Sequence, residues 1–197
     1  MSMMQPASQC DFAAIDFECT GPAPGYQNTP WQIGVVVVSN GRVDLERSFN
    51  SLLHVPAEQP FNPYTPGRWA QLRQELAYAP APQELWPQLR GLIAEMPLIA
   101  HHAPTERTFL GQLFPFQQFG PWIDTLPLAR RAFPKQRDYK LENLIPQLGL
   151  SAILAERCPG GAPHDAFYDA VACATLFELV VNAPGWKSVS TAALAAM

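Results

Sequence analysis

The chain has 197 residues, the size of one ordinary globular domain. Hydrophobic residues make up 48% of it and charged residues 15%, a balance typical of a folded protein and unlike that of a disordered one. The formal net charge of -4 argues against the broad basic surface of a protein that grips long duplexes. A local basic cluster would still suit an enzyme that holds only a few nucleotides.

The cysteines and the apolar runs of the sequence indicate where in the cell the protein is expected. The four cysteines show neither CxxC nor zinc-site spacing, so we expect reduced thiols. The first residues carry no basic stretch followed by an apolar run, so we expect no signal peptide. The longest apolar run, residues 33–38, is too short to cross a membrane. We therefore expect a cytoplasmic protein with no membrane partner.

The first part of the chain has the pattern of a β-meander. Residues 1–9 are expected to form a flexible tail, and strands are predicted at 11–18 and 31–38. The second strand is apolar on both faces, as in the centre of a covered sheet. The Asn-Gly pair at 40–41 predicts a two-residue hairpin turn into a third strand near 43–53.

The rest of the chain alternates between helices and short strands. A proline-rich loop, residues 54–66, separates it from the meander. We expect helices at 67–78, 83–95, 105–114, 126–132, 141–148 and 165–182, a short strand at 97–100 and another that ends at 123–124. This order predicts one α/β domain over residues 10–184, followed by a C-terminal tail over 185–197.

Two acidic residues occupy the first, otherwise apolar, strand. Side chains alternate along a strand, so Asp16 and Glu18 point to one face, about 7 Å apart. Two carboxylates this close repel each other and resist burial, and a divalent cation between them removes both costs. The alternative is a polar strand end that enters a turn, since Asp-x-Glu before a turn is common.

Two further acids lie on the apolar faces of helices. Glu106 shares its face with Phe109 and Leu110. Asp169 shares its face with uncharged residues, on a helix that carries no lysine or arginine to pair with it. These positions favour a metal site. The alternative for both is a first-turn acid that interacts with the helix dipole.

His164 precedes the last long helix. It stands before Asp165, the expected N-cap, so it belongs to the loop that enters the helix, where it can lean over whatever Asp169 binds. A lone loop histidine is more often an exposed residue without a function. His101 and His102 have the same alternative as exposed or structural residues.

Taken in order, these residues match the motifs of a known family. DFECTG at 16–21 is similar to Asp-x-Glu-Thr-Thr-Gly, and HDAFYD at 164–169 to His-x4-Asp. AHHAPTERTFL at 100–110 is similar to Ala-His-Asn-Ala-x-Phe-Asp followed by Phe-Leu. Over residues 11–182 the chain resembles the DEDDh branch of 3′–5′ exonucleases, which includes RNase T, exonuclease X and the proofreading subunit of bacterial DNA polymerase III.

The resemblance implies a fold, two ions and a reaction. The fold is ribonuclease H-like, an α/β fold with a central mixed five-stranded sheet and helices on both faces. The ions are Mg²⁺ or Mn²⁺: Asp16 is shared between both, Glu18 and Asp169 complete the first site, and Glu106 holds the second. His164 is implied as the general base. The expected reaction releases nucleoside monophosphates from the 3′ ends of single-stranded DNA or RNA.

Substrate contacts are expected at four more residues. Thr20 and His101 lie inside the first and second motifs. Arg130 and Lys140 belong to a basic cluster that suits the backbone of a strand, although such clusters are usually solvated surface charges. Dimers occur among relatives, so a homodimer is compatible with the resemblance. The sequence identifies no replication or repair partner.

Three departures from the family pattern define the alternatives. Glu106 stands where the family has aspartate, His102 where it usually has asparagine, and residues 67–78 where a His-Gly-Ile-Thr segment is expected. Glu106, the missing segment and the acidic net charge motivate a second hypothesis, a catalytically weak or silent exonuclease-fold module that binds nucleic-acid ends or a partner protein. A third hypothesis is an unrelated metal-dependent phosphodiesterase that acts on a small nucleotide.

Overall fold

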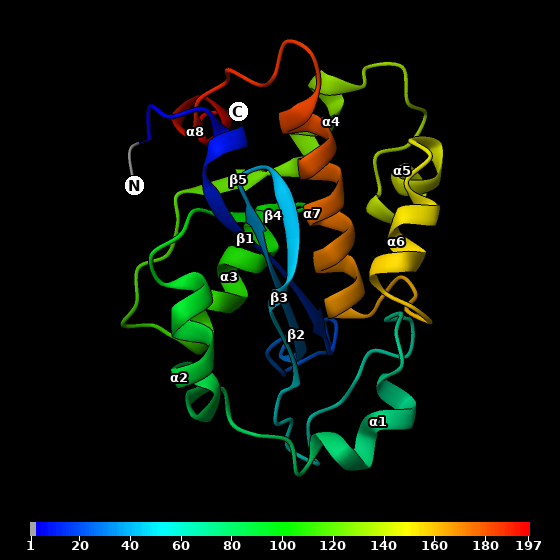
Figure 1. The fold of residues 1–197 in the computed structure, drawn as a ribbon. Coiled ribbons are helices and arrows are strands. Elements are labelled where there is room, and N and C mark those ends of the chain that lie inside the picture. Colours follow the sequence, from blue (N-terminus) through cyan, green and yellow to red (C-terminus); the bar gives the residue numbers. More distant parts are fainter. Residues whose placement is uncertain (1–2) are drawn as a thin grey trace.

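A computed structural model describes residues 3–197 and arranges them around one five-stranded sheet (Figure 1). Residues 1 and 2, part of the expected N-terminal tail, lie outside the described residues. The strands are β1 (Asp11–Cys19), β2 (Pro30–Ser39), β3 (Arg42–Leu52), β4 (Leu98–Ala100) and β5 (Trp122–Asp124). The helices are α1 (Trp69–Leu76), α2 (Pro82–Ile93), α3 (Ala103–Leu113), α4 (Thr125–Ala132), α5 (Leu141–Gln147), α6 (Ser151–Arg157), α7 (Ala166–Asn182) and α8 (Thr191–Ala195), with a 3-10 turn η1 (Ala7–Gln9). Every predicted strand and helix is present, with bounds that differ by a few residues.

The sheet is mixed, and its strand order is β3-β2-β1-β4-β5. β1 is central: it pairs antiparallel with β2 and parallel with β4, and β4 pairs parallel with β5. The predicted hairpin is confirmed, because Ser39 faces Arg42 across Asn40 and Gly41. Both turn residues have positive φ (49° and 72°), a conformation that asparagine and glycine tolerate better than other residues.

Helices cover both faces of this sheet (Figure 1). Phe12 and Ala14 of β1 pack in a core with α7, whereas Ala13 and Ile15 pack on the opposite face with α2 and α3. This alternation is the period-2 pattern of a strand buried on both faces. Asp16 continues the even-numbered series, so its side chain lies on the face that α7 covers.

Gly34 sets how closely α7 approaches the sheet. It is the neighbour of Asp16 across the β1–β2 pair. A Cβ at position 34 would collide with the backbone of Ala166 and Phe167, in the first turn of α7, so the close approach requires glycine. Because Asp169 lies in the same turn, this contact brings it towards β1 and Asp16.

Short segments outside the predicted elements, namely α6 and the two ends of the chain, also form ordered structure. The helix α6 was not expected, because its seven residues bury one apolar side chain, Leu154, and give little periodicity. The expected tails, residues 3–9 and 185–197, contact each other instead of lying free: Ala7 donates an N–H to the carbonyl of Val189 at 2.9 Å, and Leu194 of α8 is buried. Within residues 3–197 no helix has the length and apolar character that a membrane span requires.

Candidate active site

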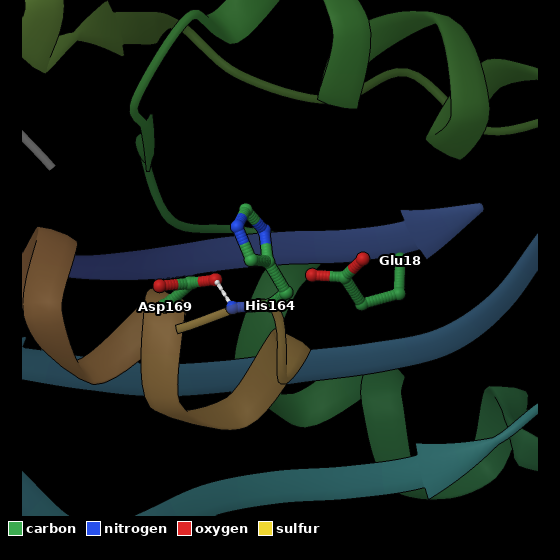
Figure 2. A group of neighbouring side chains, drawn as sticks. All are labelled: Glu18, His164 and Asp169. Atoms are coloured by element: carbon green, nitrogen blue, oxygen red, sulfur yellow. Dashed lines mark hydrogen bonds between the residues drawn. The ribbon is translucent and has the colours of Figure 1, made fainter. Parts of the chain in front are cut away.

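Four carboxylates from three elements converge on the β1 face. Asp16 and Glu18 come from β1, Glu106 from α3 and Asp169 from α7. Burial, and then the charges of the other three carboxylates, raise the pKa of Asp16 well above its usual value. One ligand atom each of Glu18, His164 and Asp169 lies within 4.8 Å of the others (Figure 2). The structure therefore brings the five predicted catalytic residues together, and their individual roles stay predictions.

Burial makes these acids reluctant to ionise. Glu18 is 8% exposed and Glu106 is 5% exposed. Burial is the main reason why the pKa of each of these two glutamates is raised to about 8. The charge of Asp169 adds to the rise at Glu18; at Glu106 an N–H donated by Phe17 opposes the rise, and the charges of Glu18 and Asp169 add to it. Burial also raises the pKa of Asp169 to about 6, although the N–H of His164 donated to its carboxylate opposes the shift. Such a cluster is stabilised by a positive charge placed among its oxygens.

Protein cations do not supply that charge. Among the described residues, no lysine or arginine forms an ion pair with any of the four acids. The Oε2 atom of Glu106 is buried and has no hydrogen-bond partner within residues 3–197. An unsatisfied buried acceptor costs about 1–3 kcal/mol, a cost that coordination to a cation offsets. Carboxylates are the ligands that Mg²⁺ and Mn²⁺ prefer, so the residues fit these ions.

His164 lies in the loop before α7, as predicted. Its backbone has a φ of 66°, and its N–H donates to Oδ2 of Asp169 at 2.8 Å. The next residue, Asp165, is the N-cap of α7 and accepts two N–H groups of the first turn, which confirms the predicted cap. The His164 ring stands between the carboxylates of Glu18 and Asp169 (Figure 2). From this position the ring can exchange a proton with a group held by the acids.

Asp124 is a positioning residue that was not among the predicted site residues. It ends β5, and its carboxylate accepts the N–H groups of His102 at 3.0 Å, Ala103 at 3.1 Å and Leu126 at 2.9 Å. One side chain thus fixes the starts of both α3 and α4. Because Glu106 lies one turn into α3, Asp124 helps to set where its carboxylate points. An aspartate directly before a helix is a recognisable N-cap signal.

The segment that replaces the family's His-Gly-Ile-Thr stretch forms a wall of the site. A Cβ at Gly67 would lie 3.1 Å from the carbonyl oxygen of His164 and 3.6 Å from Oε2 of Glu18. The neighbouring Arg68 pairs with Asp165 at 2.8 Å. The residues just before α1 therefore contact both motif elements, although the expected segment is absent from the sequence.

One cavity opens at Asp16 and Asp169, and a second cavity adjoins the first. The first, of about 310 Å³, is lined by Asp16, His101, Lys140, Leu141, Glu142, Pro163, His164 and Asp169. The second, of about 410 Å³, shares His101 and Lys140 with the first and includes Arg130. Arg130 and Lys140 are both exposed. The predicted basic residues thus line a path that begins at the carboxylates.

The other two residues predicted to contact the substrate, Thr20 and His101, form hydrogen bonds within the protein. Thr20 is fully buried, and its hydroxyl accepts the N–H of Thr29 at 3.0 Å, so in this conformation its side chain faces neither cavity. Both ring nitrogens of His101 are bonded, one to the hydroxyl of Thr125 at 2.9 Å and one to the carbonyl of Tyr139 at 2.7 Å. Burial lowers the pKa of His101. These bonds favour the structural interpretation of His101, with its ring as a wall of the cavity.

Comparisons with known proteins agree with this geometry. A family model for RNase T, described as exonuclease, matches residues 13–177. Exonuclease X, solved in complex with 5′-overhanging duplex DNA, is 24% identical with a TM-score of 0.68, and the alignment covers 93% of this chain and 99% of that one. The nuclease domain of 3′hExo, a DEDDh family member bound to rAMP, is 17% identical with a TM-score of 0.68, covering 92% and 96%.

A third structure extends the comparison. E. coli exonuclease I in complex with a dT13 oligonucleotide is 15% identical with a TM-score of 0.67, and the alignment covers 88% of this chain and 41% of that one. No curated protein sequence matches the chain. The three likenesses establish the ribonuclease H-like exonuclease fold that the motifs implied.

Proposed function

Because the chain belongs to the RNase T exonuclease family, we propose that it is a metal-dependent 3′–5′ exonuclease that acts on single-stranded ends of DNA or RNA. The observation that carries the proposal is the convergence of four carboxylates, of which Glu18 and Glu106 are buried and Asp16 and Asp169 half-buried, and Glu106 has an unpartnered oxygen. The structural relatives solved with overhanging duplex DNA and with dT13 support a nucleic-acid end as the substrate.

The four acids and His164 would have different roles in the reaction. Asp16, Glu18, Asp169 and Glu106 would hold Mg²⁺ or Mn²⁺, two ions per site. Such ions, when bound, stabilise the charge on the attacking and leaving oxygens at phosphorus. His164 would take the proton of the attacking water, a task suited to an imidazole near neutral pH. The product is a nucleoside monophosphate.

The basic path would hold the substrate. Lys140 lines the cavity that opens at Asp16 and Asp169, Arg130 and Lys140 line the cavity beside it, and cationic side chains there would contact phosphates of the strand. The guanidinium carbon of Arg130 lies 5.7 Å from the centroid of the Tyr139 ring, which limits its freedom. Phosphate contacts of this kind carry no sequence information, so we expect little sequence preference.

The test is a degradation assay on 5′-labelled single-stranded DNA and RNA with Mg²⁺ or Mn²⁺. We expect a ladder that shortens from the 3′ end, disappears with EDTA and disappears in Asp16→Ala. The control variant is Glu46→Ala, which removes an exposed acid on β3 and should leave the ladder unchanged. Intact substrate from the wild-type protein under every metal would contradict the proposal.

The second candidate, a silent end-binding module, is favoured by one observation, Glu106 at the position of the family's aspartate. A gel-shift or anisotropy measurement on the same labelled strands distinguishes the two. Binding of strands without cleavage in either metal supports the module, and cleavage excludes it. A small nucleotide diester added as a third substrate tests the phosphodiesterase alternative, which requires turnover of the diester and none of the polymers.

We also propose a cytoplasmic location, supported by the four cysteines, which are all free thiols. A homodimer remains a prediction of the family resemblance. Light scattering of the purified protein measures it directly.

A further inference from the structure

The carboxylate of Glu142 contacts the imidazole of His164, a residue distant from it in the chain. Its Oε2 lies 3.1 Å from Nε2 of the imidazole, and the two side chains are 33% and 41% exposed. Glu142 belongs to the first turn of α5, and His164 to the loop before α7. The contact therefore joins two segments of the chain beside the four carboxylates, and both residues line the first cavity.

The backbone beneath Glu142 is well fixed. Asp138 accepts the N–H of Lys140 at 3.0 Å and the side-chain amide of Asn143 at 2.7 Å, which closes the turn that enters α5. Further along α5, Leu144 is buried in a cluster with Leu176 of α7. The two helices are therefore held against each other, and the distance between their first turns is set by packing.

Each member of the pair has few other partners. Among the described residues, Glu142 forms no ion pair with a lysine or arginine. The His164 backbone N–H donates to Asp169, and within residues 3–197 the ring forms one hydrogen-bonding contact, with the carboxylate of Glu142. The ring orientation thus depends on Glu142.

We propose that Glu142 is a positioning residue that orients the imidazole of His164 for proton transfer. This inference rests on the proposed exonuclease function. Nε2–H of the neutral ring donates to Glu142, which leaves the lone pair on Nδ1 to accept a proton. Water gives its proton to Nδ1, the water oxygen bonds to phosphorus, and the bond from phosphorus to the leaving oxygen breaks. The carboxylate of Glu142 then stabilises the imidazolium, as in other acid–histidine pairs.

Two other roles for Glu142 have distinct consequences. As a further metal ligand, Glu142 would contribute to cation affinity even when His164 is removed. As an ordinary partly exposed ion pair, it would contribute little to any property of the protein. A positioning role instead predicts that Glu142 matters for turnover only while His164 is present.

The experiment measures steady-state cleavage of a labelled strand by Glu142→Ala, Glu142→Asp, His164→Ala and the double variant Glu142→Ala/His164→Ala. We expect kcat of Glu142→Ala to fall by about 10- to 100-fold, as for other partners of a ligating or reacting histidine. KM should change by about twofold at most, because a carboxylate does not attract the anionic phosphates of the strand. Glu142→Asp should recover part of kcat, and the double variant should be no slower than His164→Ala.

Controls separate folding and metal effects from positioning. Glu156→Gln removes an exposed glutamate on the nearby α6 and should leave kcat unchanged. Thermal unfolding should give similar Tm values for all variants, and Mn²⁺ binding by calorimetry should be the same in wild type and Glu142→Ala. An unchanged kcat in Glu142→Ala, a further loss in the double variant, or weakened Mn²⁺ binding would each overturn the inference.

An NMR readout keeps the inference separate from the proposed function. The ring-nitrogen signals of His164 should show the Nε2–H tautomer in the wild type and a mixture of tautomers in Glu142→Ala. If no variant cleaves any strand but this shift in tautomers is seen, the proposed function fails and the orienting contact stands. If strands are cleaved and the tautomer is the same in both proteins, the orienting contact fails alone.

Discussion

At the level of single residues, the sequence could predict the acids whose direction follows from local geometry. Strand alternation placed Asp16 and Glu18 on one face, and helix spacing placed Asp169 inward; the structure brings all three together. The contact of Glu142 with His164 and the bonds of Asp124 to the start of α3 could not be predicted, because they join residues distant in the chain, whereas the cap that Asp124 forms on α4 is local. The periodicity of a strand or helix predicts the face on which a side chain lies. It does not predict which residues of other elements that side chain contacts.

We expect Glu106 to determine whether the site works better with Mg²⁺ or with Mn²⁺. Its extra methylene, relative to the family's aspartate, changes the reach of a buried carboxylate with an unpartnered oxygen. Mg²⁺ is strict about octahedral geometry. We therefore expect Glu106→Asp to raise kcat with Mg²⁺ by about tenfold, equivalent to ~1.4 kcal/mol, and with Mn²⁺ by less.

The matched control is Glu58→Asp, which makes the same change at an exposed position and should alter neither rate. Both variants are compared with the wild type in cleavage assays with each metal. Equal rates for Glu106→Asp and wild type in both metals would mean that the longer side chain already holds the ion correctly.

At the level of elements, α7 and β2 determine how the motifs meet. Helix α7 was predicted from its length and apolar sequence, but its contact with β2 through Gly34 was not, because a glycine inside a strand does not reveal what approaches it. Gln32, 3% exposed, adds a bond from Ala166 N–H to its side chain at 3.3 Å. The position of Asp169 therefore depends on two β2 residues outside the family motifs.

Gly34→Ala should push the first turn of α7 away from the sheet. We expect the free energy of unfolding to fall by about 1–3 kcal/mol, the usual cost of overpacking, and activity to fall because Asp169 moves relative to Asp16. Urea unfolding and the cleavage assay measure the two effects. Gly91→Ala is the control: its Cβ would meet nothing within 4 Å, so this helical position should gain about 0.5–1 kcal/mol. A Gly34→Ala protein as stable and active as the wild type would contradict the role assigned to the contact.

At the level of the whole molecule, the order of elements and the motifs were sufficient to predict the fold class, and the mixed five-stranded sheet is confirmed. The ends of the chain were not predictable as packed segments. Pro6 and Ser190 form a β-bridge between segments that are far apart in the sequence, and neither segment has a strong periodicity of its own. Such contacts form only after the body of the domain has brought the two segments together.

The stability of the metal-free protein should depend on pH through the acid cluster. Glu18 and Glu106 have a pKa of about 8 when folded, against an ordinary value of 4.5, so between these values the folded state binds more protons than the unfolded state. The contribution of these two groups to the free energy of unfolding is therefore greatest near pH 4.5 and below. It falls as the pH rises towards 8. We expect Tm in EDTA to decrease over this interval.

Scanning calorimetry from pH 5.5 to 8.5 measures this slope. Glu106→Gln removes one of the two groups and should flatten it, whereas Glu46→Gln, at an exposed site, should not. Mn²⁺ should raise Tm more at pH 8 than at pH 6, because it binds the ionised acids. A Tm in EDTA that is constant or rises over this interval in the wild type would contradict the proposed cause.

The raised pKa values of the buried glutamates also predict a coupling between cation binding and proton release. With pKa values of about 8, Glu18 and Glu106 favour the protonated form at neutral pH, and an incoming ion would displace those protons. We therefore expect protons to be released into the solvent on binding, and the apparent affinity for the ion to increase with pH. The heat measured by titration calorimetry then includes the ionisation enthalpy of the buffer, and its variation between Tris and phosphate counts the protons released per ion.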